Sequence, residues 1–149
     1  MKSLGKIGIL PLLVLLLVSC HPSPEKGREK LRIAVIPKGT THEFWKSIHA
    51  GAIKASRELG VEIVWKGPQK EDDRDQQLTL VEDFVNRGVD GIVLAPLDDK
   101  ALMRPVAEAK RAGIPTVIID SSLGGNDPVS FLATDNYRGG VLAAERLGV

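Results

Sequence analysis

The chain has 149 residues, with 20 basic and 19 acidic side chains, and this near balance gives no reason to expect nucleic acid or an anionic membrane surface as its partner. Its single cysteine, Cys20, excludes a disulfide within the chain. Only 4% of the residues are aromatic, so each aromatic side chain needs its own explanation.

The first 19 residues have the pattern of a signal peptide. Lys2 and Lys6 precede an uncharged apolar run at 7–18, which is shorter than the ~20 residues that a membrane-spanning helix needs. The run leads into LVSC (17–20), which resembles the bacterial lipoprotein box. We therefore expect cleavage before Cys20 and lipidation of its thiol, which anchors the protein to a membrane. The alternative is an ordinary secretory cleavage site with an incidental cysteine.

The lipidated cysteine and a flexible tether are predicted to occupy residues 20–30, which contain two prolines and no apolar periodicity. His21 rather than an aspartate follows the cysteine. In a bacterium with two membranes, we therefore expect an anchor in the outer membrane, facing the periplasm. The folded domain is predicted to span residues 31–149.

Apolar runs rich in valine and isoleucine predict five strands. The runs at 91–95 and 115–119 are almost continuously apolar, as in strands that are buried on both faces of a parallel sheet. The predicted strands are LRIAVI (31–36), VEIVW (61–65), GIVLA (91–95), PTVIID (115–120) and VSFLAT (129–134).

Helical patterns separate these strands. Asp98 is a predicted N-cap, and Pro105 predicts either a kink or a separate first turn before it. The alternation predicts an α/β fold with a doubly wound, mostly parallel sheet. The predicted helices are 43–59, 72–87, 98–112 and a last one that starts after residues 135–136 and runs to about 147.

Phe44 and Trp45 are adjacent at the start of the first predicted helix. Phe44 shares an apolar stripe with Ile48 and Leu59, which predicts that it faces the core. Trp45 is rotated ~100° from that stripe. We expect Trp45 at the edge facing the strand ends, either as an apolar face for a ligand or as a cover for the edge of the core.

Ligands of open parallel sheets bind beyond the carboxyl ends of the strands, where Asp120 and Ser121 follow a buried strand. The Asp120 carboxylate can accept hydrogen bonds from hydroxyls or an amine. The alternative is a turn residue that bonds the backbone of 121–123. Ser121 either donates to a ligand or completes the turn.

Motifs of several enzyme classes are missing from the sequence, which has no GxGxxG, no GxxxxGK[ST] and no GxSxG. His42 and His49 are seven residues apart, or ~10.5 Å along a helix, so they cannot share a metal ion. The acidic run EDDRD at 71–75 is predicted to be a solvated helix start. We expect no catalytic residue, no cofactor and no metal.

Four segments together resemble the type I periplasmic sugar-binding proteins of the ribose-binding family. They are RIAVIPKGTTHEFWKSIHAGA (32–52), GVDGIVLAPLDDKAL (88–102), AGIPTVIIDSSL (112–123) and FLATDNYRGG (131–140). The resemblance implies two lobes that close on a small polar ligand, and residues 31–149 resemble the first lobe only, as in a fragment. Repressors with the same core begin with a DNA-binding helix-turn-helix, whereas a lipoprotein signal occupies that place here.

The resemblance also implies roles for individual residues. An Asn-Pro-Phe-Phe-like stretch of the family contacts the sugar, and the matching positions here include His42, Phe44 and Trp45. Asp120 matches an aspartate that grips sugar hydroxyls, and Ser121 replaces the arginine that often follows it. We expect a solute-binding lipoprotein that captures a small polar ligand, with a sugar expected, for an ABC importer and its permease. The alternatives are a module that presents its solute to a chemoreceptor or sensor kinase, and an enzyme on a doubly wound sheet.

Overall fold

The computed structural model describes residues 30–148. The predicted signal peptide, Cys20 and nearly all of the predicted tether lie outside these residues, so cleavage, lipidation and the tether stay predictions. Within residues 30–148, no helix is long and apolar enough to cross a membrane.

Five short strands form one parallel sheet, in the order β2-β1-β3-β4-β5. The predicted α/β fold with a parallel sheet is confirmed, with strands one or two residues shorter at their ends than the apolar runs. The strands are β1 (Arg32–Ile36), β2 (Glu62–Trp65), β3 (Gly91–Leu94), β4 (Thr116–Ile119) and β5 (Ser130–Leu132).

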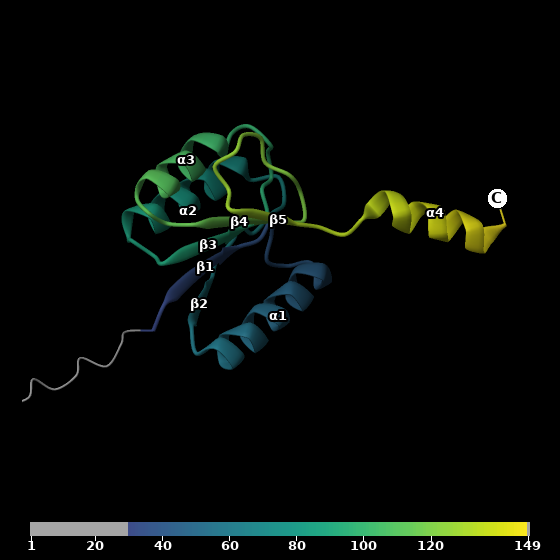
Figure 1. The fold of residues 1–149 in the computed structure, drawn as a ribbon, viewed down its shortest axis with the longest axis horizontal. Coiled ribbons are helices and arrows are strands. Elements are labelled where there is room, and N and C mark those ends of the chain that lie inside the picture. Colours follow the sequence, from purple (N-terminus) through teal and green to yellow (C-terminus); the bar gives the residue numbers. More distant parts are fainter. Residues whose placement is uncertain (1–29, 149) are drawn as a thin grey trace, which may run out of the picture.

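Helices cover both faces of this sheet (Figure 1). Helix α1 lies on one face, α2 and α3 lie together on the other, and α4 extends away from the sheet beyond β5. No residue of α4 is buried. The helices are α1 (Glu43–Leu59), α2 (Arg74–Asn86), α3 (Met103–Arg111) and α4 (Asn136–Leu147).

The hydrophobic core lies mainly between the sheet and the pair α2 and α3. Its members come from β1, β3, β4, these two helices and the segments that connect them, and Phe84 of α2 is the largest of them. On the other face of the sheet, Trp45 is the only buried residue of α1. Further along α1 the side chains facing the sheet are half-buried, and the ring of His49 stacks on Trp65 of β2 with centroids 4.4 Å apart.

Helix α1 is rotated relative to the sequence prediction. Trp45 is 3% exposed, whereas Phe44 and Leu59 are 46% and 73% exposed. The prediction that Phe44 faces the core is therefore wrong, whereas the burial of Trp45 agrees with its second alternative, a cover for the edge of the core. The buried side of α1 runs through Trp45, Ile48 and His49 instead, because a shift of one position turns a helix by ~100°.

The start of α3 also differs from the prediction. Asp98 does not cap the helix, whose N-cap is Leu102 without a side-chain hydrogen bond. Instead the Asp98 carboxylate accepts from the backbone N–H groups of Lys100 and Ala101 at 2.9 and 2.8 Å, which closes a turn before the helix. Pro105 then lies in the first turn of α3, where its missing donor costs little. The separate first turn is the alternative that the structure shows.

Candidate functional site

The loops that follow β1 and β4 meet at the carboxyl edge of the sheet through Lys38 and Asp120. The Lys38 ammonium lies 2.7 Å from Asp120 Oδ2 and donates to Ser121 Oγ at 2.5 Å. The Ser121 hydroxyl in turn donates to Asp120 Oδ2 at 3.1 Å. The side chains of Lys38 and Asp120 are 21% and 32% exposed, so the ion pair is partly shielded but reachable from solvent.

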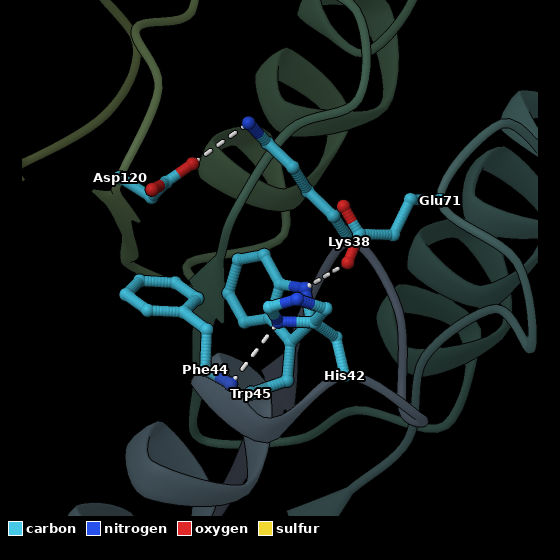
Figure 2. Close-up of a pocket in the computed structure, with 6 residues that line it drawn as sticks. All are labelled: Lys38, His42, Phe44, Trp45, Glu71 and Asp120. Carbon is cyan, nitrogen blue, oxygen red and sulfur yellow. Dashed lines mark hydrogen bonds and ion pairs between the residues drawn. The ribbon is translucent and has the colours of Figure 1, made fainter.

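An open cavity of about 240 Å³ lies beside this ion pair. Figure 2 shows Lys38 and Asp120 pointing toward one another on one side of the cavity, with the rings of Phe44 and Trp45 on another. The two rings meet edge to face, with centroids 4.9 Å apart and planes at 77°. The cavity is lined by Lys38, His42, Phe44, Trp45, Glu71 and Asp120.

His42 is the N-cap of α1 and contributes to the cavity through its ring. Its Nδ1 accepts from the backbone N–H of Phe44 at 3.2 Å. In a neutral ring this leaves the proton on Nε2, which is then available as a donor. The next residue, Glu43, does not line the cavity and bonds Lys46 at 2.6 Å, a contact that lowers the pKa of Glu43.

Asp120 has a left-handed backbone, with φ of 67°, and is the only non-glycine residue of the described chain with positive φ. Aspartate tolerates this region better than most residues. Such outliers gather at binding and catalytic sites, where the surrounding structure holds them in place. Here the contacts with Lys38 and Ser121 and the backbone bond from Asp120 N to Leu132 O at 3.0 Å hold the residue.

Gln77 of α2 connects the loops that follow β1 and β3 beneath the site. Its side chain is fully buried. The amide donates to Pro37 O at 3.1 Å and Ala95 O at 2.9 Å, and its oxygen accepts from Leu97 N at 2.8 Å. These three hydrogen bonds tie Pro37, which precedes Lys38, to the loop that follows β3, so Gln77 fixes the backbone next to Lys38.

A second open cavity, of about 550 Å³, adjoins the first and shares Phe44, Trp45 and Asp120 with it. Its other lining residues come from α1, β4, the end of β5, the segment that follows β5, where Thr134 lies, and the start of α4, where Asn136 lies. The exposed Phe44 ring borders both cavities. Phe44 and Trp45 therefore lie between the first cavity, which is polar, and the second cavity, which is more apolar.

The donor set of the first cavity suits a polar, uncharged ligand better than a metal ion. Among residues 30–148, no group of three or more histidine, aspartate, glutamate or cysteine side chains is placed to hold a metal. Lys38 neutralises Asp120, and the Glu71 carboxylate accepts from Trp45 Nε1 at 2.7 Å. Aromatic faces beside hydrogen-bonding groups are the surface that a compact polyol with apolar ring faces requires.

The structure brings most of the predicted site residues together. His42, Phe44, Trp45 and Asp120 line one cavity, while Ser121 stands behind it and bonds Lys38 and Asp120. Whether each of them contacts a ligand stays a prediction. The predicted turn bonds from Asp120 to the backbone of 121–123 are not among the side-chain hydrogen bonds of the described chain, and the carboxylate faces Lys38 instead.

Sequence reasoning missed two residues of the cavity, Lys38 and Glu71. Lys38 lies directly after the strand end, the position that the rule for parallel sheets marks, so its position was the available signal. Glu71 belongs to the acidic run predicted to be a solvated helix start. That interpretation holds for Asp73, the N-cap of α2, and for Asp75 in its first turn. It is wrong for Glu71, which precedes the helix and bonds Trp45.

Comparison with known proteins shows which family of sequences and which solved structures this chain is similar to. Residues 33–148 match the family described as "Periplasmic binding protein domain". A "D-ribose/D-allose-binding protein" of Pseudomonas aeruginosa is 36% identical over 130 residues, which cover 80% of this chain and 40% of that protein.

Two solved structures show the same fold. A carbohydrate transporter solute-binding protein from Agrobacterium radiobacter, in complex with D-arabinose, is 38% identical with a TM-score of 0.73, and the match covers 79% of this chain and 40% of that one. An ABC transporter solute-binding protein from Agrobacterium vitis, with bound D-fucose, is 42% identical with a TM-score of 0.72 over 77% of this chain and 41% of that one. The chain thus spans less than half the length of these relatives.

Proposed function

Since this chain belongs to the family of periplasmic binding protein domains, we propose that its cavity forms one wall of a sugar-binding site that serves an ABC importer. The protein captures the sugar and catalyses no reaction. A second lobe supplies the opposite wall, as the length of the relatives supports. The closed, loaded form is what the permease recognises.

The observation that carries this proposal is the pairing of two aromatic rings with the Lys38–Asp120 ion pair at one cavity. A pyranose or furanose presents apolar C–H faces and a rim of hydroxyls. The exposed Phe44 ring and the part of the Trp45 ring that lines the cavity supply apolar contact, and Asp120, Lys38 and His42 supply acceptors and donors. Ser121 contributes by holding the ion pair, and it adds a polar contact if the sugar reaches it.

The relatives support a sugar as the ligand class. The matching protein of Pseudomonas aeruginosa is named for D-ribose and D-allose, and the two solved structures hold D-arabinose and D-fucose. These sugars are neutral. A neutral polyol fits a cavity whose one cation is already paired with a carboxylate.

We further propose that Cys20 carries the lipid anchor and that the protein works outside the cytoplasmic membrane. The support is the lipobox-like LVSC sequence at 17–20 and the lack of any disulfide partner. One acyl chain would anchor weakly, whereas several chains on one residue hold firmly. In a cell with two membranes, residue His21 favours the outer membrane over the inner one.

The test of sugar binding is a titration of the ¹⁵N-labelled protein with D-ribose, D-allose, D-arabinose and D-fucose, followed by NMR. One lobe leaves an open cavity, so we expect weak, millimolar binding with shifts confined to the Trp45 indole N–H and the amides around residues 38–45 and 120. Phe44→Ala should abolish these shifts. Shifts of equal size with inositol, or shifts spread over α3, would contradict a sugar site at this cavity.

A further inference from the structure

The indole N–H of Trp45 needs an acceptor because the ring is almost completely buried. Trp45 is 3% exposed, and buried tryptophans ordinarily find a partner for this group. The partner here is Glu71, whose Oε1 lies 2.7 Å from Nε1. Glu71 itself is exposed and belongs to the segment between β2 and α2, 26 positions further along the chain.

Glu71 reaches the indole by passing over Gly39. A Cβ built on Gly39 would lie 2.7 Å from Glu71 Cγ, closer than real Cβ atoms approach another atom. The backbone of Gly39 does not have positive φ, so its conformation alone does not require glycine. The need for a glycine at this position comes from the space that the Glu71 side chain occupies.

This contact fixes the orientation of a ring that forms a wall of the cavity. Trp45 and Glu71 both line the cavity, together with Lys38, which follows β1, and Asp120, which follows β4 (Figure 2). A hydrogen bond to a carboxylate is stronger than one to a neutral acceptor. It holds the indole N–H toward Glu71, while the indole and the Phe44 ring meet edge to face with centroids 4.9 Å apart.

We propose that Glu71 is a positioning residue of the binding site, which acts by holding the Trp45 indole in the orientation that a ligand meets, and that Gly39 is glycine to let it do so. The identity of the ligand in this inference rests on the proposed function. The effect of Glu71 on the Trp45 indole does not depend on that function. Glu71 adds to the fixed wall of the site a residue from the loop after β2, which the sequence pattern assigned to solvent.

The test uses two independent ways of breaking the same contact. Glu71→Ala removes the acceptor. Gly39→Ala keeps the Glu71 carboxylate in the chain, but the new Cβ pushes the Glu71 side chain away from the indole. Glu71→Gln keeps an amide oxygen that can accept from Nε1. Asp72→Ala is the matched control, because it removes the neighbouring exposed acid. The chain has two tryptophans, so a Trp65→Phe variant assigns the Trp45 indole resonance.

The readout is hydrogen exchange of the Trp45 indole N–H, measured by NMR beside the urea midpoint of each variant. We expect exchange to be faster by about 10- to 150-fold in Glu71→Ala and Gly39→Ala, the range that corresponds to one hydrogen bond to a charged group. Glu71→Gln should restore most of the protection, and Asp72→Ala should match the wild type. If Glu71 only stabilised the fold, the indole N–H of Trp45 would exchange faster only as far as the urea midpoint of the variant falls.

Binding is the second readout, with D-allose and D-ribose as probes. If the wild type binds either sugar, the two disruptive variants should bind about tenfold more weakly, as for one lost hydrogen bond, and Glu71→Gln should recover. If the wild type binds neither sugar, the proposed ligand class fails while the exchange data still decide the role of Glu71. Unchanged indole exchange in both Glu71→Ala and Gly39→Ala would overturn the inference.

Discussion

The ammonium group of Lys38 lies 2.7 Å from Asp120 Oδ2, so an ion pair joins the ends of two strands that are not neighbours in the sheet. Strand β3 lies between β1 and β4, so no backbone hydrogen bond of the sheet joins β1 directly to β4. The contact places one donor and one acceptor of opposite charge beside the cavity.

Replacing Lys38 by methionine should weaken sugar binding more than it weakens the fold. The pair is partly exposed, so its loss should change the free energy of unfolding by less than about 1 kcal/mol. Loss of a charged hydrogen-bonding group at the ligand should lower affinity by about tenfold or more. The measurements are urea unfolding and NMR titration with D-allose. Lys54→Met, which breaks the exposed pair with Glu58 on α1, is the matched control and should leave affinity unchanged.

The two adjacent aromatics should respond to alanine in opposite ways. Trp45→Ala removes the only buried residue of α1 and should lower the free energy of unfolding by ~3–5 kcal/mol. Phe44 is 46% exposed, so Phe44→Ala should cost little stability and should chiefly reduce sugar affinity. Urea midpoints and titrations of both variants check this. A larger stability loss for Phe44→Ala than for Trp45→Ala would contradict the burial seen here.

Gln77→Met should destabilise the protein although it preserves the size and shape of the side chain. The substitution leaves Leu97 N and the carbonyls of Pro37 and Ala95 without their partner, at about 1–3 kcal/mol for each buried group that finds no substitute. Gln76→Met, next to it on the exposed side of α2, serves as the control. Equal urea midpoints for the two variants would show that the buried amide is dispensable.

The turn before α3 should give stability a pH dependence. Hydrogen bonds from the backbone N–H groups of Ala101 and Lys100 lower the pKa of Asp98. A carboxyl with a depressed pKa in the folded state contributes stability that is present above its unfolded pKa, near pH 4, and is lost as the pH falls through the folded pKa. The urea midpoint should therefore fall more steeply below pH 4 in the wild type than in Asp98→Asn. Parallel curves for the two proteins would contradict this assignment.

Membrane anchoring is tested by replacing Cys20 with serine and fractionating the cells. We expect the wild-type protein in the membrane fraction and Cys20→Ser in the soluble periplasmic fraction, because the thiol is the attachment point of the lipid. Detergent phase partitioning gives an independent measure of the attached lipid. Wild type and variant both in the soluble fraction would rule out the anchor.

Much of the fold was predictable from the sequence because each buried strand is a short run of apolar residues with helical patterns between. The rule that ligands lie beyond the carboxyl ends of parallel strands also pointed to the edge of the sheet where the cavity beside Asp120 lies. The rotation of α1 was not predictable in this way. Phe44 lies on the apolar stripe that the sequence shows and Trp45 lies off it, whereas the partner of the Trp45 indole N–H is an acceptor 26 positions away, which no local period reveals. Glu71 was missed for the same reason, since its partner Trp45 is distant in sequence, whereas the position of Lys38 directly after a strand end was a usable signal.

The single buried residue of α1 has a consequence for how the site opens. Proteins unfold locally in cooperative units, and the units with little buried apolar surface open at the lowest free energy. Helix α1 carries His42 at its N-cap and Phe44 and Trp45 in its first turn. When this helix detaches from the sheet, all three residues leave the cavity together. A ligand that contacts these residues binds only the state in which α1 is packed on the sheet. By mass action it therefore slows amide exchange along the whole of α1. Exchange protection of this helix is therefore a sensitive report of occupancy, even for residues far from the sugar.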